Sequence, residues 1–141
     1  MQPEAIHAFL EAAPVSRTLG LEWLDGDGES CRLRMAAAEE LGQQLGFVQG
    51  GVLGALADQA AATALWIRTR GERRFVGCDY HMEFLRPAQV GGAALVARAT
   101  VEHCGRQRAV VDVVLAQGES RAARGSFRFL FPADPPERAP A

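Results

Sequence analysis

The sequence predicts an α+β domain in which an antiparallel sheet of about six strands wraps around one long central helix. Residues 48 to 67 are apolar around most of a helix's circumference, so this helix has to be covered by other elements on several sides. Residues 75 to 131 alternate apolar and polar residues instead, which is typical of strands with one dry face. Because these strands follow one another without intervening helices, the sheet is expected to be antiparallel.

The first part of the chain predicts a short helix and a hairpin. Residues 3 to 13 have proline near their start and apolar residues at helical spacing, and this helix is expected to end at Pro14. Residues 18 to 23 and 31 to 35 alternate on either side of a turn signal at residues 25 to 28. A short N-terminal helix therefore precedes the first two strands.

The rest of the chain predicts the central helix and four more strands. After a loop rich in Glu and Gln, the apolar run forms a helix of about 18 residues that ends before Gly71. The four strand patterns are separated by glycine and proline and cover residues 75 to 84, 93 to 103, 107 to 116 and 120 to 131.

Length and composition favour one domain and exclude several partners. A chain of 141 residues, 48% of them hydrophobic, has room for a single core, which we assign to residues 1 to 131. Residues 132 to 141 contain four prolines and are expected to be a disordered tail. The net charge is −2 and the arginines are scattered, so neither nucleic acid nor a membrane is an expected partner. Without a signal or membrane-spanning run, we expect a cytoplasmic protein.

The cysteine and histidine residues predict neither a disulfide framework nor a metal site. Cys31, Cys78 and Cys104 are widely spaced and form no CxxC pair, so we expect reduced packing residues. His81 lies among alternating strand residues without HxxxH or HExxH spacing. No metal and no redox cofactor is expected.

One carboxylate, Asp58, lies in the middle of the apolar helix. The residues three, four or seven positions away on its face are small, namely Gly51, Gly54, Ala55, Ala61 and Ala62. An acid buried at such a narrow contact has two interpretations. It is a structural acid bonded to an arginine or to backbone donors across a subunit contact, or it is a catalytic carboxylate with a raised pKa beside a slot for substrate.

Gly50 and Gly51 lie where the central helix begins. Their N–H groups have no partner within the helix, and the helix dipole is positive there. Glycine lets a ligand carbonyl come close, so these N–H groups could bind the oxyanion of acyl transfer; equally, the pair could only turn the chain into the helix. Asp58 is about 12 Å further along the axis, too far for one carbonyl to contact both. A site that uses both groups therefore needs two subunits with antiparallel helices across a two-fold axis.

Two segments resemble a known family. QGGVLGALAD, residues 49 to 58, resembles the helix start of hot-dog-fold acyl-CoA thioesterases, in the branch similar to phenylacetate-degradation (PaaI-like) thioesterases. CDYHMEFLRPAQVG, residues 78 to 91, resembles the strand and glycine turn of that branch. The resemblance covers roughly residues 17 to 131. It implies a hot-dog fold, hydrolysis of acyl-CoA thioesters to free acid and CoA without a cofactor, and a homodimer that pairs into a dimer of dimers, a homotetramer.

The resemblance also implies roles for particular residues. Asp58 matches the acid that serves as nucleophile or general base, and Gly50 matches the glycine whose N–H polarises the thioester carbonyl. Gln43 lies where relatives often have an Asn that positions the carbonyl or the water. The two neighbours of Gly50, Gln49 and Gly51, are expected to contact the substrate.

This sequence departs from the family at two further positions. Gln49 replaces the usual His. Gly77 is a second substrate-contact position, near a place where relatives often supply Ser or Thr to hold the attacking water. Tyr80, His81 or Ser126 could supply the missing hydrogen-bonding group.

Several residues are candidates for binding the CoA end and the acyl end of the substrate. Arg68, Arg70, Arg73 and Arg74 either contact the phosphates of CoA or are solvated residues at a helix C-terminus. Arg106 has the same two interpretations, and we count it among the substrate-binding residues. The candidates for the acyl end are Phe47, Trp66, Phe84 and Leu85.

Two rival functions use the same fold. Because the usual His and Ser are missing, the protein could be a non-catalytic module that binds acyl-CoA. A hydratase would pair a His with an acid at other positions, and no such pair is visible.

Overall fold

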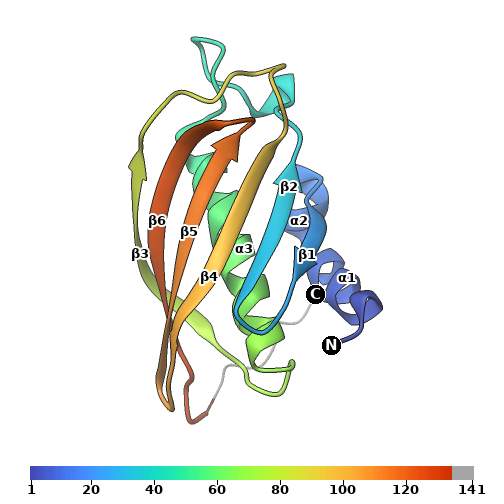
Figure 1. Ribbon diagram of the computed structural model, residues 1–141, viewed down its shortest axis with the longest axis vertical. Coiled ribbons are helices and arrows are strands. Elements are labelled where there is room, and N and C mark those ends of the chain that lie inside the picture. Colours follow the sequence, from blue (N-terminus) through green and yellow to red (C-terminus); the bar gives the residue numbers. More distant parts are fainter. Residues whose placement is uncertain (135–141) are drawn as a thin grey trace.

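The structure is a computed structural model that describes residues 1 to 134 and contains one antiparallel sheet packed against a long helix (Figure 1). The helices are α1 (Pro3–Ala12), α2 (Pro14–Leu19), the 3-10 helix η1 (Glu39–Leu41) and α3 (Gly50–Arg68). The strands are β1 (Glu22–Gly26), β2 (Ser30–Met35), β3 (Val76–Phe84), β4 (Leu95–Cys104), β5 (Arg108–Gln117) and β6 (Ser120–Leu130). The strand order is β1-β2-β4-β5-β6-β3, with all neighbours antiparallel. The predicted α+β class, with six strands around one long helix, is confirmed.

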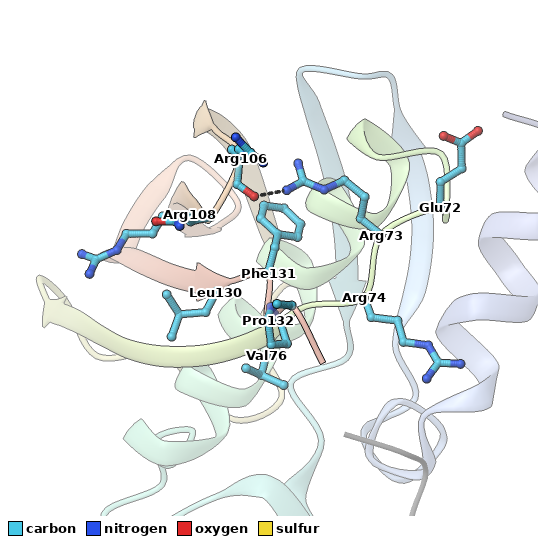
Figure 2. Close-up of a pocket in the computed structure, with 11 residues that line it drawn as sticks. Glu72, Arg73, Arg74, Val76, Arg106, Arg108, Leu130, Phe131 and Pro132 are labelled. Carbon is cyan, nitrogen blue, oxygen red and sulfur yellow. Dashed lines mark hydrogen bonds between the residues drawn. The ribbon is translucent and has the colours of Figure 1, made fainter. Parts of the chain in front are cut away.

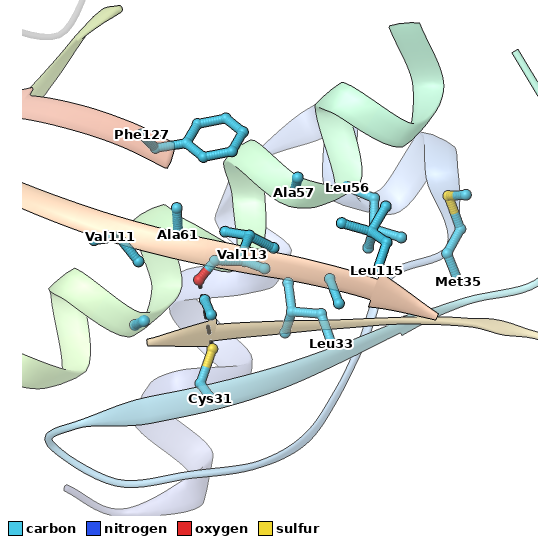
Figure 3. Close-up of a cluster of buried hydrophobic side chains, with 14 of the residues drawn as sticks. Cys31, Leu33, Met35, Leu56, Ala57, Ala61, Val111, Val113, Leu115 and Phe127 are labelled. Carbon is cyan, nitrogen blue, oxygen red and sulfur yellow. Dashed lines mark hydrogen bonds between the residues drawn. The ribbon is translucent and has the colours of Figure 1, made fainter. Parts of the chain in front are cut away.

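The hydrophobic core lies between α3 and the inner face of the sheet (Figure 3). The helix packs on β2, β4, β5 and β6, because its apolar residues occupy several sides of its circumference. Strands β2, β4 and β5 bury alternate residues, as the strand period requires. In β5 the buried residues are Ala109, Val111, Val113 and Leu115.

Leu56→Ala is expected to lower the free energy of unfolding by about 2–5 kcal/mol, because it empties space in a core that cannot fully collapse around it. The Leu56 side chain is 0% exposed and lies among the core side chains of Figure 3. Leu45→Ala is the matched control, since Leu45 is 77% exposed, and its effect should stay within about 0.5 kcal/mol. Denaturant unfolding of both variants measures the difference, and equal effects would contradict the assigned core.

The two edges of the sheet differ. β1 lies beside α1, whereas β3 pairs only with β6, so its other edge has no strand partner among residues 1 to 134. β3 is exposed along nearly its whole length, and Val76, Tyr80 and Phe84 are its large exposed apolar residues. An open strand edge with apolar side chains is a surface on which another strand can pair.

The start of the chain differs from its prediction. Pro14 begins the second helix α2 rather than ending the helical region, and residues 18 and 19 belong to that helix rather than to a strand. Proline is well suited to the first position of a helix, where its missing N–H costs nothing. Gly20 then ends α2 in the left-handed conformation, with φ of 63°.

Other sequence predictions have mixed outcomes. Cys31 is buried, and burial raises the pKa of its thiol to about 12. Cys78 is exposed on β3, so the prediction that all three cysteines are packing residues is wrong for it. Most of the tail predicted to be disordered, residues 132 to 141, lies outside the described residues. No helix within residues 1 to 134 has the length and apolarity needed to cross a bilayer.

Candidate active site

The N-terminus of α3 presents two backbone donors. Gln49 precedes the helix, and its carbonyl accepts hydrogen bonds from the N–H groups of Val52 and Leu53. Its own N–H donates to the carbonyl of Leu41 at 2.9 Å, which fixes the approach of the chain. Within the described part of the chain, no acceptor takes the N–H of Gly50 or Gly51. Both N–H groups therefore remain available at the positive end of the helix dipole.

Glycine at position 50 permits close packing under an aromatic ring. A β-carbon there would lie 3.1 Å from Cζ of Phe84, tighter than ordinary van der Waals contact. At Gly51 a β-carbon would meet nothing within 4 Å. A side chain at position 50 would therefore press on the ring of Phe84 at the end of β3, while Gly51 borders open space on the exposed face of α3.

Gly50 and Gln43 line one cavity of about 310 Å³ at this end of the helix. The Oε1 atom of Gln43 accepts hydrogen bonds from the N–H groups of Leu45 and Phe47, so this oxygen is engaged within its own loop. The amide NH₂ group of Gln43 is a donor. The structure therefore brings together two predicted site residues that can both donate to a carbonyl oxygen.

The other walls of this cavity are mostly apolar. They include Phe47, Phe84 and Leu85, three of the four residues predicted for the acyl end; the fourth, Trp66, lines a different cavity. Arg86 is the one charged residue in this lining, and it is not among the predicted site residues. The sequence feature that could have pointed to Arg86 is its place directly before Pro87, at the end of a strand pattern.

Asp58 lies two turns further along α3 and is exposed in the single chain. Nonpolar protein around it still desolvates the carboxylate and raises its pKa above the ordinary value of 3.8. Within residues 1 to 134, no hydrogen bond or ion pair reaches this carboxylate. A structural ion pair inside the subunit therefore does not explain it.

The face of α3 that carries Asp58 is lined by small residues and borders β3. Gly51 and Asp58 are exposed, and Ala55 and Ala62 are partly exposed. A β-carbon at Gly54 would lie 3.7 Å from Oη of Tyr80. Since residues four apart share one side of a helix, Tyr80 brings a hydroxyl to the side of α3 that carries Asp58.

The three candidates for the missing hydrogen-bonding group near Gly77 lie on opposite faces of the sheet. Tyr80 stacks on the buried Phe127, with ring centroids 4.9 Å apart, so it faces α3. His81 and Ser126 are the next residues along β3 and β6 and are cross-strand neighbours, so they point to the outer face. Tyr80 therefore lies on the face of the sheet towards α3, and His81 and Ser126 lie on the other face.

Gly77 lies near the beginning of β3, at an irregularity in its pairing with β6. A β-carbon there would be 3.9 Å from the ring of Phe129, which is ordinary contact distance. Position 77 therefore has room for a larger side chain, although this chain supplies no hydroxyl there.

Arg106 is at the opposite end of α3 from Gly50, in a groove of about 980 Å³ (Figure 2). The guanidinium of Arg73 donates to the carbonyls of Gly105 and Arg106, at 2.9 and 2.6 Å, and lies 3.4 Å from the ring centroid of Phe131. Arg73 thus holds the β4–β5 turn in place. Within one subunit, Arg106 is not brought near Gly50, since α3 alone spans about 28 Å.

The remaining arginines do not form one cradle. Arg74 and Arg108 extend to opposite sides of the groove in Figure 2, and Arg68 forms an ion pair with Glu29. No three His, Cys, Asp or Glu side chains in the described part of the chain are placed to hold a metal ion.

Comparison with known proteins identifies the family. Residues 45–123 match the family model described as the thioesterase superfamily. A protein of Deinococcus radiodurans, whose name assigns it provisionally to the esterases, is 31% identical over 117 residues, which cover 83% of this chain and 77% of that protein.

Solved structures share the fold. The PaaI protein from the phenylacetic acid degradation operon of E. coli has a TM-score of 0.82 and 24% identity, covering 92% of this chain and 91% of that chain. AziG of S. sahachiroi has a TM-score of 0.80 and 25% identity, covering 84% and 96%. A thioesterase of Haemophilus influenzae has a TM-score of 0.81 and 23% identity, covering 92% and 90%. The predicted resemblance is confirmed: this chain has the hot-dog fold and belongs to the thioesterase superfamily.

Proposed function

We propose that this protein hydrolyses acyl-CoA thioesters to free carboxylic acid and CoA, in a site shared by two subunits. The observation that carries the proposal is the cavity where the free N–H of Gly50 and the amide of Gln43 meet. The only partnerless carboxylate on that helix, Asp58, is about 12 Å away in the same chain. A second subunit with its α3 antiparallel to the first brings its own Asp58 to this cavity.

In the proposed reaction, Gly50 and Gln43 bind the carbonyl oxygen and Asp58 activates the attacking group. The Gly50 N–H and the Gln43 amide bind the carbonyl oxygen and stabilise the negative charge that develops on it. Asp58 of the second subunit takes a proton from water as the water oxygen bonds to the carbonyl carbon, or it attacks that carbon itself and forms an anhydride that water then cleaves. The carbon–sulfur bond breaks, and CoA leaves as a thiolate that takes up a proton.

Two surface features support the shared site. The unpaired edge of β3 can continue the sheet into a second subunit. The small residues around Asp58 allow two helices to approach closely, and a carboxylate exposed in one chain becomes enclosed when they do. A homodimer, and its pairing into a dimer of dimers, are part of this proposal.

We assign the CoA end of the site to Arg86 rather than to Arg106. Arg86 is the cation in the lining of the cavity that holds Gly50, and guanidinium groups suit phosphate contacts. Gln49 and Gly51 lie beside Gly50 and remain proposed substrate contacts. The cytoplasmic location and the absence of nucleic-acid or membrane partners stay predictions.

A panel of acyl-CoA thioesters tests the proposal, with release of CoA followed by a chromogenic thiol reagent. Turnover that rises with enzyme concentration is the expected result. The rival function, a binding module, predicts that calorimetry detects acyl-CoA binding while no thiol is released. Absence of both would contradict the proposed substrate class.

The pH dependence follows from the raised pKa of Asp58. As base or nucleophile Asp58 must be ionised, so kcat/KM is expected to rise with pH through an acid limb that lies above 3.8. Between the ordinary pKa of 3.8 and the raised pKa of the folded state, Asp58 is protonated in the folded protein and ionised in the unfolded chain. The contribution of Asp58 to the free energy of unfolding therefore decreases as pH rises through this range. A pH profile that keeps the same limb in Asp58→Asn would contradict the assignment.

Tyr80→Phe is expected to lower kcat about 10-fold, the effect of losing one hydrogen bond to the attacking water. The reason is that Tyr80 is the remaining hydroxyl near the Asp58 side of α3. Ser126→Ala is the matched control, because Ser126 points to the outer face of the sheet, and its kcat should not change. Steady-state kinetics of both variants measure this, and a larger loss in Ser126→Ala would reverse the assignment.

A further inference from the structure

A second cavity lies further along the face of α3 that carries Asp58. It measures about 480 Å³, within the range of small-molecule sites. Gln59, Ala62 and Trp66 of α3 form its floor. Its lining thus begins at the residue after Asp58 and continues along the helix away from Gly50.

Aromatic side chains from three separate elements form the walls of this cavity. Phe9 comes from α1, Trp66 from α3 and Phe75 from the segment before β3. The rings of Phe9 and Trp66 are stacked, with centroids 4.5 Å apart and planes 12° apart. The contact between Phe9 and Trp66 therefore ties α1 to the central helix and fixes one wall.

Two arginines, Arg73 and Arg74, belong to the lining of this cavity. The guanidinium of Arg73 is engaged with two carbonyls and with the ring of Phe131, so only its stem is free to line the cavity. Arg74 is exposed, so water can solvate its charge. The interior is therefore suited to an uncharged, apolar group.

We infer that this cavity holds the acyl group of the substrate and that Phe9 of α1 determines acyl selectivity. The inference rests on the proposed function. When Asp58 meets the thioester held at Gly50 of the other subunit, the substrate lies between two cavities. The cavity of Gly50 measures about 310 Å³ and has Arg86 beside the rings of Phe47 and Phe84. The second cavity is larger, about 480 Å³, and its aromatic side chains are Phe9, Trp66 and Phe75. The phosphates of CoA belong to the first and an apolar acyl group larger than acetyl belongs to the second.

The test compares hexanoyl-CoA with acetyl-CoA in the full-length protein. Ala62→Phe fills the cavity and is expected to lower the ratio of kcat/KM for hexanoyl-CoA to that for acetyl-CoA by at least about 10-fold, since a pocket contact discriminates by the size of the group it accepts. Phe9→Ala opens the wall and is expected to shift the preference from hexanoyl-CoA towards decanoyl-CoA. His7→Ala is the matched control: it removes another aromatic contact of α1, with Trp23, outside the cavity, and should leave both ratios unchanged.

Trp66 gives a second readout that does not need turnover. The chain has two tryptophans, so Trp23→Phe leaves Trp66 as the only one. Its fluorescence should change on addition of hexyl-CoA, a thioether that cannot be hydrolysed, and not on addition of CoA alone. This measurement keeps the inference testable if Ala62→Phe fails to fold.

The outcomes separate the two hypotheses. Hydrolysis with unchanged ratios in Ala62→Phe and Phe9→Ala, and no fluorescence change, overturns the inference and leaves the proposed function intact. An equal loss with both thioesters in an Ala62→Phe protein that is still dimeric would show that CoA, not the acyl group, occupies the cavity, which also overturns the inference. A wild-type protein that hydrolyses no acyl-CoA contradicts the proposed function, and the inference with it.

Discussion

Asp58→Asn is expected to lower kcat for acyl-CoA hydrolysis by at least about 100-fold, the usual loss when an acid–base group is removed. The amide has nearly the same shape as the carboxylate but neither accepts a proton from water nor attacks a carbonyl carbon. Asp58 has no partner among the described residues, so the change breaks no contact inside the subunit. The variant should therefore fold and bind acyl-CoA while failing to cleave it.

Two further variants serve as a control and a comparison for Asp58→Asn. Asp112→Asn removes a carboxylate that is exposed on β5, and its turnover should equal that of the parent. Gln43→Ala should lose less activity than Asp58→Asn, because Gly50 still donates to the carbonyl oxygen. Equal turnover in Asp58→Asn and the parent would leave the acid as a subunit-contact residue, the structural interpretation that the sequence left open.

The elements with strong periodicity could be predicted from the sequence. α3 and the last four strands start and end within a few residues of their predicted bounds, because each is long and has a regular pattern of apolar residues. α2 could not be predicted, since six residues carry too little periodicity to compete with the strand pattern around Leu19. Its helix depends instead on Pro14 at the start and on Gly20 at the end.

The part of the site that lies on the central helix could be predicted, because the position of a residue along a helix fixes where its functional group lies. Gly50 had to lie at the start of the helix, and its distance from Asp58 follows from the helical rise. The surface that covers Asp58 could not be decided from the pattern alone, because an apolar helix gives the same pattern whether its last uncovered face meets the sheet or a second chain. Arg86 was missed because its place in the cavity depends on two segments far apart in the chain, those of Gln43 and Arg86, lining the same space.

Mixing two inactive variants is expected to restore activity if each site takes Gly50 from one subunit and Asp58 from the other. Gly50→Val places a branched side chain against Phe84 and blocks the approach of the carbonyl, while Asp58→Asn removes the carboxylate. In a heterodimer of the two, one site has both defects and the other has none, so the purified heterodimer should recover about half of the parent activity. Each variant alone should stay at least about 100-fold below the parent.

The reciprocal pairing decides between a shared site and a site within one subunit. A heterodimer of the parent chain with the double variant, Gly50→Val and Asp58→Asn, carries one defect in each shared site and should be inactive. If the site lay within one subunit, this heterodimer would keep about half of the activity, and the mixed single variants would recover none. Differently tagged subunits, co-expressed and purified through both tags, give the two heterodimers for the same thiol-release assay, and the two arrangements predict opposite results in each of them.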